Sequence, residues 1–397
     1  MDRPVTQYPA LSLEDSGFSF DDLSRRPDVE AENLQAHDAA DRLLLGTAAE
    51  RLQADSGGVV VIGDAYGALT LGAAALYGAR DIRVHQDPLS GELALHRNAD
   101  SAGLAGTYRS MALGPDLLAG ARTVLLRLPR SLDALEEITA LIAAHARPDV
   151  QVFAGGRLKH MTVAMNGVLG RWFGTVTAGL ARQKSRVLTV TDPLPAGQQP
   201  ANRFPLAQRH DVGLPAPLEL RAFGAAFAGA SLDIGTRFLL PHLGAARQAV
   251  SAIDLGCGTG AIAAYLAMTR PALHVTATDQ SASAAASASM TMAANGVADR
   301  VEVRRDDALA GLPDASAQLI VLNPPFHIGA SVHAGIALKL FADAGRVLEP
   351  GGELWTVWNS HLAYKPALNR LVGPTREVAR NPKFTVTVST RRPGGQG

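Results

Sequence analysis

The sequence has 397 residues, more than one ordinary domain needs, so we expect two domains. Hydrophobic residues make up 47% of it and aromatic residues only 5%, which favours large cores built from Ala, Val and Leu. The 37 basic residues balance the 37 acidic ones, which argues against indiscriminate coating of nucleic acid but allows a local basic patch. The single cysteine, Cys257, excludes an intrachain disulfide.

The sequence predicts neither an export signal nor a membrane anchor. Residues 1–15 contain acids and prolines but no apolar stretch, so we expect no signal peptide. No run of about 18 uncharged apolar residues occurs, so we expect no membrane span. These features predict a cytoplasmic protein.

The first half alternates between helix-like and strand-like stretches. Residues 1–40 are polar and irregular, apolar spacing predicts a helix over 41–51, and a β-branched run predicts a buried strand over 59–62. Further helices are expected over 68–77 and 132–146, and further strands over 82–85, 123–128 and 150–154. This alternation predicts a parallel α/β sheet.

A proline-rich stretch, residues 192–220, is the best candidate for a linker. We place the domain boundary there, with one domain over residues 1–205 and the other over 206–397. The second half predicts strands over 252–255, 275–278, 301–303, 319–322 and 353–357, and a late or edge strand over 383–389. The alternation of strands and helices therefore restarts after the linker.

The two halves resemble copies of one another. In each half a buried strand leads into a glycine turn, an acid ends the next strand, and a later strand ends in a polar residue. The matched landmarks pair Gly63 with Gly256, Asp87 with Asp279, and Arg127 with Asn323. Their similar spacing predicts a duplication, and hence two tandem Rossmann-like α/β domains.

The turn of the second copy has the spacing Gly-x-Gly-x-Gly, at Gly256, Gly258 and Gly260. Glycines allow a tight turn and let a ligand approach the backbone. Asp254 precedes the turn on the strand and suits a cationic or amino-bearing ligand better than a pyrophosphate.

Two further acids follow strands of the second copy. Asp279 ends the next strand, where a carboxylate can accept both ribose hydroxyls of a nucleoside. Asp307 follows the third strand, where it can accept the amino group of an adenine, and the adjacent Asp306 is the alternative.

The segment Asn323-Pro324-Pro325-Phe326 follows the fourth strand. Two prolines end the strand and make a rigid loop at the carboxyl edge of the sheet, where open α/β sheets bind ligands. The Asn323 side-chain carbonyl and the Pro324 backbone carbonyl can accept both hydrogens of an amino group, and Phe326 can stack on the ring that bears it. This loop predicts the catalytic residues.

These motifs resemble the series of class I S-adenosylmethionine-dependent methyltransferases, and Asn-Pro-Pro-Phe is typical of those that methylate amino or amide nitrogens. Residues 227–240, 156–160 and 180–186 resemble bacterial ribosomal RNA guanine-N2 methyltransferases. Residues 381–384, together with Lys159-His160, are more similar to the member that acts on large-subunit 23S RNA than to the small-subunit 16S member.

The resemblance implies methyl transfer from S-adenosylmethionine to the N2 amine of a guanine in ribosomal RNA. It also implies that the N-terminal domain is a degenerate copy of the catalytic one. The residues agree, because Val61 replaces Asp254, Ala65 replaces Gly258 and Arg127 replaces Asn323. Neither a metal site nor an obligate protein partner is expected.

The degenerate domain contains a basic span from Arg157 to Arg186 without any acid. Binding to RNA phosphates needs such a local excess of positive charge. The residues predicted to contact RNA are Arg157, Lys159, Arg182, Lys184 and Arg186.

The alternatives are a 16S guanine-N2 methyltransferase, a release-factor glutamine or DNA adenine methyltransferase, and a non-catalytic RNA-binding assembly factor. The duplicated N-terminal half speaks against the glutamine and adenine enzymes. The intact Asn323 speaks against an assembly factor.

Overall fold

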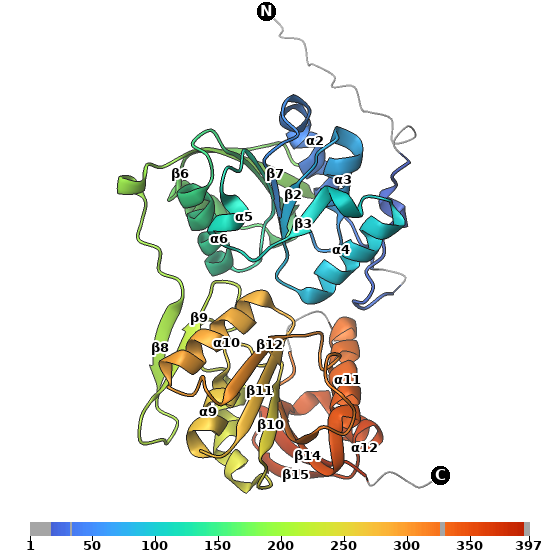
Figure 1. The fold of residues 1–397 in the computed structure, drawn as a ribbon, viewed down its shortest axis with the longest axis vertical. Helices are drawn as coiled ribbons and strands as arrows, with labels where there is room; N and C mark the ends of the chain where they lie inside the picture. The colour runs from blue at the N-terminus through green and yellow to red at the C-terminus, as the bar shows by residue number, and fades with distance from the viewer. Residues whose placement is uncertain (1–16, 32–33, 326–329, 393–397) are drawn as a thin grey trace, which may run out of the picture. The chain divides into compact units, whose positions relative to one another are not determined.

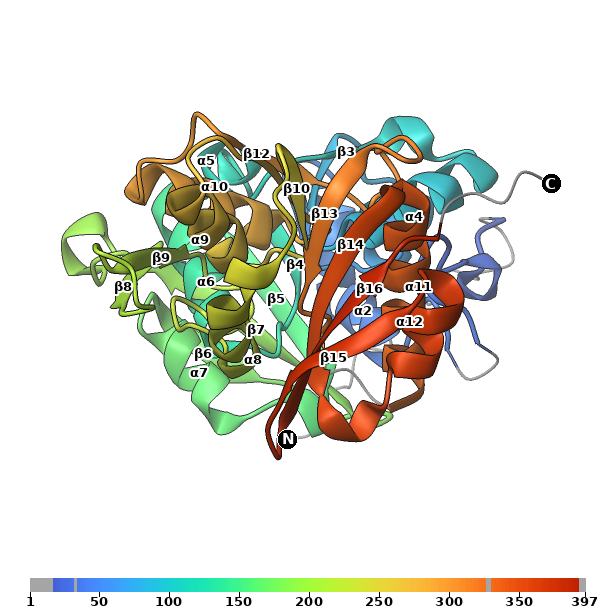
Figure 2. The same ribbon diagram turned by 90° about the horizontal axis from the view of Figure 1, so that it is seen from below.

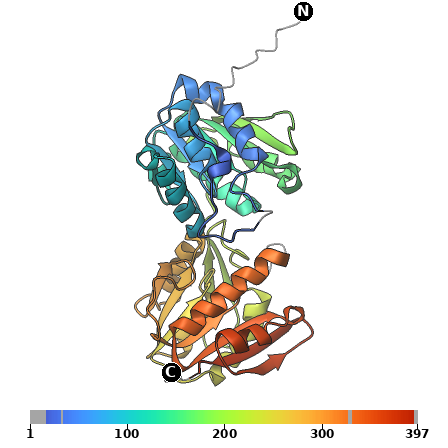
Figure 3. The same cartoon turned by 90° about the vertical axis from the view of Figure 1, so that its right-hand side faces the viewer.

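The computed structural model describes residues 17–31, 34–325 and 330–392, and the chain divides into two compact units. The first comprises Met1–Gln86, Gly91–Arg130 and Ile138–Pro200, and the second comprises Asp87–Ser90, Ser131–Glu137 and Ala201–Gly397. Figures 1 and 3 colour the first from blue to green and most of the second from yellow-green to red. The main border between the units falls between Pro200 and Ala201, and two short segments of the first half belong to the second unit.

The first unit is built on a seven-stranded sheet in the order β3-β2-β1-β4-β5-β7-β6. Its strands are β1 (Val59–Ile62), β2 (Ile82–His85), β3 (Tyr108–Ser110), β4 (Thr123–Arg127), β5 (Gln151–Arg157), β6 (Phe173–Ala178) and β7 (Ser185–Pro193). The first five run parallel, and β7 runs antiparallel to both of its neighbours.

The second unit repeats this order as β12-β11-β10-β13-β14-β16-β15, with β16 antiparallel to its neighbours. Its strands are β10 (Ser251–Leu255), β11 (His274–Asp279), β12 (Val301–Arg305), β13 (Ala317–Leu322), β14 (Leu348–Asn359), β15 (Thr375–Arg380) and β16 (Phe384–Thr390). The matching strand orders confirm the predicted tandem Rossmann-like domains.

Helices connect the strands in both units. The first half of the chain contains α2 (Ala39–Ala54), α3 (Ala68–Tyr77), α4 (Leu89–Ser101), α5 (Pro115–Leu118), α6 (Leu132–His145) and α7 (Val163–Gly170). The second contains α8 (Ile234–Leu239), α9 (Ala261–Thr269), α10 (Ala282–Ala294), α11 (Ala330–Val347) and α12 (Lys365–Leu371). Within the described ranges, no helix is long and apolar enough to cross a membrane.

The second sheet is buried on both faces because its strands alternate between two cores. On β13, Leu319 and Val321 face the core shared with α8, α9 and α10, whereas Ile320 and Leu322 face the core shared with α11 and α12. Figure 2 shows these helix groups on opposite sides of β10, β13 and β14. This arrangement explains the continuous apolar runs in the sequence.

Several strands escaped prediction, mostly at edges. The outermost strands β6 and β15 bury few side chains, so they have little apolar pattern. Two more, β8 (Leu206–His210) and β9 (Leu218–Ala222), form a hairpin where the sequence suggested only a linker. The last predicted strand, β16, lies inside the sheet between β14 and β15.

The hairpin is fixed to α10 by polar side chains. The backbone N–H groups of Glu219, Arg221 and Phe223 donate to the side chains of Asn295, Thr291 and Ser287 at 3.0, 3.0 and 2.9 Å. Alternate N–H groups of a strand point to one side, and residues four apart on a helix share a face. Every second residue of the strand can therefore meet every fourth residue of the helix. Strand β9 is thus bonded to β8 on one edge and to helix side chains on the other.

We expect Thr291→Val to lower the free energy of unfolding by about 1–3 kcal/mol, because it leaves the Arg221 N–H without its acceptor at a fully buried site. Urea denaturation measures the change. The matched control is Thr269→Val, an exposed threonine whose hydroxyl bonds only to carbonyls of its own helix, for which the change should stay within about 0.5 kcal/mol. Equal changes in the two variants would contradict a stabilising role for the hydrogen bonds between the hairpin and α10.

Candidate active site

The register of the second sheet gathers the predicted site residues at one edge. Leu255, the last residue of β10, pairs with Thr278 on β11 and with Leu322 on β13. The glycine turn, Asp279 and Asn323 follow these residues, so all three begin at the same level of the sheet. This carboxyl edge is where open α/β sheets bind ligands.

The glycine turn has the backbone that its sequence predicts. Gly256, Gly258 and Gly260 have φ values of +67°, +54° and +79°, in the left-handed region that favours glycine. A Cβ on Gly260 would lie 2.7 Å from Cε of Met292, so packing against α10 also requires glycine there. A Cβ on Gly256 or Gly258 would meet nothing within 4 Å, which leaves open space for a ligand beside the turn.

Asp254 lies fully buried beneath the turn. Its Oδ2 accepts a hydrogen bond from the Ala263 N–H at 2.9 Å, which fixes the start of α9. Within the described ranges, its Oδ1 has no hydrogen-bond partner. Burial, with a further contribution from the charge of Asp279, raises the pKa of Asp254 to about 7. A cationic ligand above the turn would stabilise the ionised form of this carboxyl.

Asp279 links the turn to the end of β11. Its Oδ2 accepts from the Gly258 N–H and its Oδ1 from the Ser281 N–H, both at 2.9 Å. Burial raises the pKa of Asp279. Each carboxylate oxygen has two lone pairs, so each can still accept a ribose hydroxyl. The predicted ribose role therefore fits this geometry.

The two acids after β12 have different neighbours. Both carboxylate oxygens of Asp307 lie 2.6 Å from Nζ of Lys339 on α11, whereas Asp306 accepts from the Gly311 N–H at 3.0 Å. Lys339 did not emerge from the sequence because it lies on a distant helix. An adenine amino group at Asp307 would share the carboxylate with this ammonium, so the role stays a prediction, with Asp306 as the alternative.

Asn323 is held by two residues that follow the hairpin. Its Nδ2 donates to Oδ2 of Asp233 at 2.8 Å and to Oγ1 of Thr236 at 2.9 Å. Its Oδ1 is buried and has no hydrogen-bond partner among the residues that the structure describes. The side-chain carbonyl is thus an acceptor with unused capacity, as the predicted contact with an amino group requires.

The rest of the predicted catalytic loop is only partly described. Pro324 is buried and Pro325 is exposed. Phe326, predicted to stack on the acceptor ring, lies outside the described residues. The sequence missed Asp233 and Thr236 as neighbours of Asn323, since nothing in their spacing links them to a loop so much later in the chain.

The first unit keeps the turn but changes the side chains around it. Gly63, Ala65 and Gly67 have φ values of +77°, +63° and +104°, so an alanine adopts the left-handed conformation of the middle glycine. The buried Val61 replaces the turn acid Asp254.

Arg127, at the position of Asn323, forms ion pairs with Asp38 at 3.0 Å and with the buried Asp41. The position that Asn323 has in the second unit is thus occupied in the first unit by an internal ion-pair network.

The predicted RNA-binding residues gather where β5 ends and β7 begins. Arg157 pairs with Ser185, and the Leu158 N–H donates to the Lys184 carbonyl at 2.9 Å. The full group is Arg157, Lys159, Arg182, Lys184 and Arg186, which we term the basic surface. Within the described part of the chain, none of its five members forms an ion pair.

The pKa of His160, beside this surface, is lowered first by burial and then by the positive charges of Arg130, Lys159 and Arg157. Arg130 therefore adds to the positive field, although it precedes the acid-free span.

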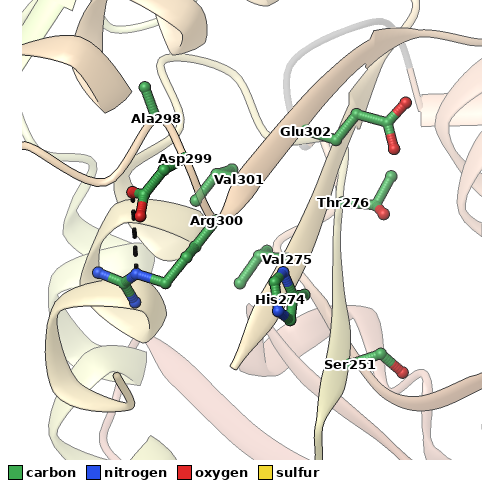
Figure 4. Close-up of a pocket in the computed structure, with 9 residues that line it drawn as sticks. All are labelled: Ser251, His274, Val275, Thr276, Ala298, Asp299, Arg300, Val301 and Glu302. Carbon is green, nitrogen blue, oxygen red and sulfur yellow. Dashed lines mark ion pairs between the residues drawn. The ribbon is translucent and has the colours of Figure 1, made fainter. Parts of the chain in front are cut away.

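A hollow of about 390 Å³ lies at the opposite edge of the second sheet (Figure 4). Ser251, His274 and Val301, the first residues of β10, β11 and β12, lie along its wall. Because it opens at the amino ends of the strands, it is separate from the site formed at their carboxyl ends.

Comparisons with known proteins find a matching family model for each half of the chain. The family model described as methyltransferase small domain matches residues 218–388, and the RLMG N-terminal domain matches residues 12–193. A structure of a T. thermophilus 16S rRNA N2 methyltransferase in complex with AdoMet and guanosine has a TM-score of 0.71 at 20% identity, over 90% of this chain and 92% of that chain. The fold and the matched domains define a class I methyltransferase.

Two curated relatives are both named ribosomal RNA large subunit methyltransferase G. The Streptomyces coelicolor protein is 37% identical over 92% of this chain and 96% of its own length. The Pseudomonas paraeruginosa protein is 37% identical over 93% of this chain and 97% of its own length. The chain belongs to this family, which confirms the predicted resemblance.

The pKa of Asp254 leads to a prediction about stability. The folded chain raises this pKa from an ordinary 3.8 to about 7, so the folded state binds the proton more tightly than the unfolded state. The resulting stabilisation is full below the ordinary pKa and is lost as pH rises through about 7. Asp254→Asn cannot ionise, so its free energy of unfolding, relative to wild type, should increase between about pH 5 and about pH 8.

Denaturation of both proteins at the two pH values measures this difference. The control is Thr269→Val, which removes no ionisable group, so its difference from wild type should not change with pH. The prediction would be wrong if the free energy of unfolding of Asp254→Asn, relative to wild type, were the same at both pH values.

Proposed function

We propose that this chain transfers a methyl group from S-adenosylmethionine to the exocyclic N2 amine of a guanine in large-subunit ribosomal RNA. The observation that supports this most directly is Asn323, whose amide hydrogens are engaged by the protein and whose buried oxygen has no partner. The names of the family members favour the large subunit over the small one.

The target amine is a poor nucleophile, because its lone pair is delocalised into the purine ring. A hydrogen bond from the amine to Asn323 Oδ1, with a second to the Pro324 carbonyl, would favour the pyramidal amine and orient its lone pair. The chain's contribution is then positioning and electrostatic stabilisation rather than strong base catalysis. The base must leave its stack to reach this loop.

The residues around the turn fit the cofactor. The space beside Gly256 and Gly258 admits its backbone contacts, and Asp279 can accept the ribose hydroxyls. The Asp254 carboxyl, whose Oδ1 has no hydrogen-bond partner among the described residues, can ionise when a cationic group of the cofactor lies beside it. S-adenosylmethionine, when bound, supplies the electrophilic methyl group. Asp307, or Asp306, would accept the adenine amine.

The basic surface is proposed to bind the RNA around the target guanine. None of its five cations forms an ion pair with a described residue, so phosphates can neutralise them. The first unit is proposed not to bind the cofactor, since Val61 and Arg127 replace two of the functional residues. A ribosomal RNA substrate implies a cytoplasmic location.

We expect wild-type protein to methylate protein-free large-subunit RNA in preference to intact large or small subunits, because free RNA leaves both phosphates and the base accessible.

Asn323→Ala should abolish the reaction, a loss of about 100-fold or more, while cofactor affinity changes less than about tenfold. Incorporation of labelled methyl groups and calorimetric titration measure the two effects. Near-normal turnover in Asn323→Ala would rule out the assignment, and preferential methylation of intact small subunits would favour the 16S alternative.

Charge reversal tests the basic surface. Arg182→Glu with Lys184→Glu should weaken RNA binding and reduce the steepness of its salt dependence by about one unit per lost phosphate contact. The matched control is Arg97→Glu with Lys365→Glu, which changes the net charge equally at two exposed residues elsewhere. Equal losses in the two pairs would indicate a general charge effect and would contradict a specific surface.

A further inference from the structure

The Asn323 amide is fixed in one orientation by its neighbours. An amide nitrogen has two hydrogens, and Nδ2 has two acceptors, Asp233 Oδ2 at 2.8 Å and Thr236 Oγ1 at 2.9 Å. The reversed amide would direct its oxygen at the Asp233 carboxylate, where two acceptors repel. The oxygen is therefore the atom left for a ligand.

Asp233 connects this amide to the start of α8. It is the N-cap of that helix, and its Oδ2 also accepts from the Thr236 N–H at 2.9 Å. One carboxylate oxygen therefore holds the helix end and the Asn323 amide together. Because a hydrogen bond to a carboxylate polarises the amide, it increases the negative charge on Asn323 Oδ1.

Gly235 lies beside the side-chain oxygens of both Asp233 and Asn323. A Cβ on Gly235 would lie 3.1 Å from Asp233 Oδ2, a tight contact, and 3.5 Å from Asn323 Oδ1, an ordinary van der Waals contact. Ile234, the other residue of this turn, is 60% exposed beside the site. A side chain at position 235 would therefore press on the carboxylate that holds the Asn323 amide.

We propose that Asp233 is a positioning residue for methyl transfer, which holds and polarises the Asn323 amide so that its oxygen accepts the substrate amine. This inference rests on the proposed function. It assigns to the start of α8 a role in turnover that helix capping alone does not require.

The test separates capping from positioning by comparing Asp233→Ser with Asp233→Asn in the full chain. Serine caps helices about as well as aspartate, but its hydroxyl lies where the aspartate Cγ lies, short of Asn323. The Asp233→Asn side chain keeps an oxygen that can reach both partners but lacks the charge. The acceptor is protein-free large-subunit ribosomal RNA from cells that lack the enzyme.

We expect Asp233→Ser to stay folded, with a modestly lower denaturation midpoint because the Asn323 amide loses one acceptor, and to keep a KM for S-adenosylmethionine within about twofold, while kcat falls about tenfold or more. Asp233→Asn should recover part of that kcat. Wild-type kcat in Asp233→Ser, or a raised KM with kcat unchanged, would overturn the positioning role.

Asn323→Ala distinguishes this failure from that of the proposed function. An inactive Asn323→Ala together with a fully active Asp233→Ser refutes the positioning role alone. A fully active Asn323→Ala refutes the proposed function and the positioning role with it.

Discussion

The parallel register of β10 with β11 and β13 is the constraint on which the site depends. It brings the glycine turn, Asp279 and Asn323 to one level, although they come from three separate parts of the chain. Because side chains alternate along a strand, a slip of one residue would exchange the two cores of the sheet. The same apolar packing that stabilises the sheet therefore fixes the geometry of the site.

The first unit shows how little must change for such a site to lose its residues. Its strand order and the positive φ values of its turn match those of the second unit. Yet Val61 stands where the turn acid would be, and Arg127 is neutralised by Asp38 and Asp41. The scaffold is retained, while the polar groups around it serve internal ion pairs.

Much of the site could be predicted because its signals are local. The strand before Gly256, the acid at Asp279 and the two prolines after Asn323 each combine a buried strand with a change of backbone or charge. Edge strands such as β6 and β15 gave no such signal, since they bury few side chains. The sequence did not predict the hairpin of β8 and β9, because the free edge of β9 bonds to helix side chains rather than to another strand.

The sequence by itself determined the duplicated α/β architecture, the glycine turn and the end of β13 before its two prolines, because strand burial and backbone conformation depend on neighbouring residues. Only the tertiary structure decided which atoms of the site residues are already bonded to other parts of the protein and which can still bind a ligand. Asp233 engages the nitrogen of Asn323 and Lys339 engages the carboxylate of Asp307, and each partner lies on an element far away in the chain. Such contacts form only after the layers pack, so no local pattern encodes them.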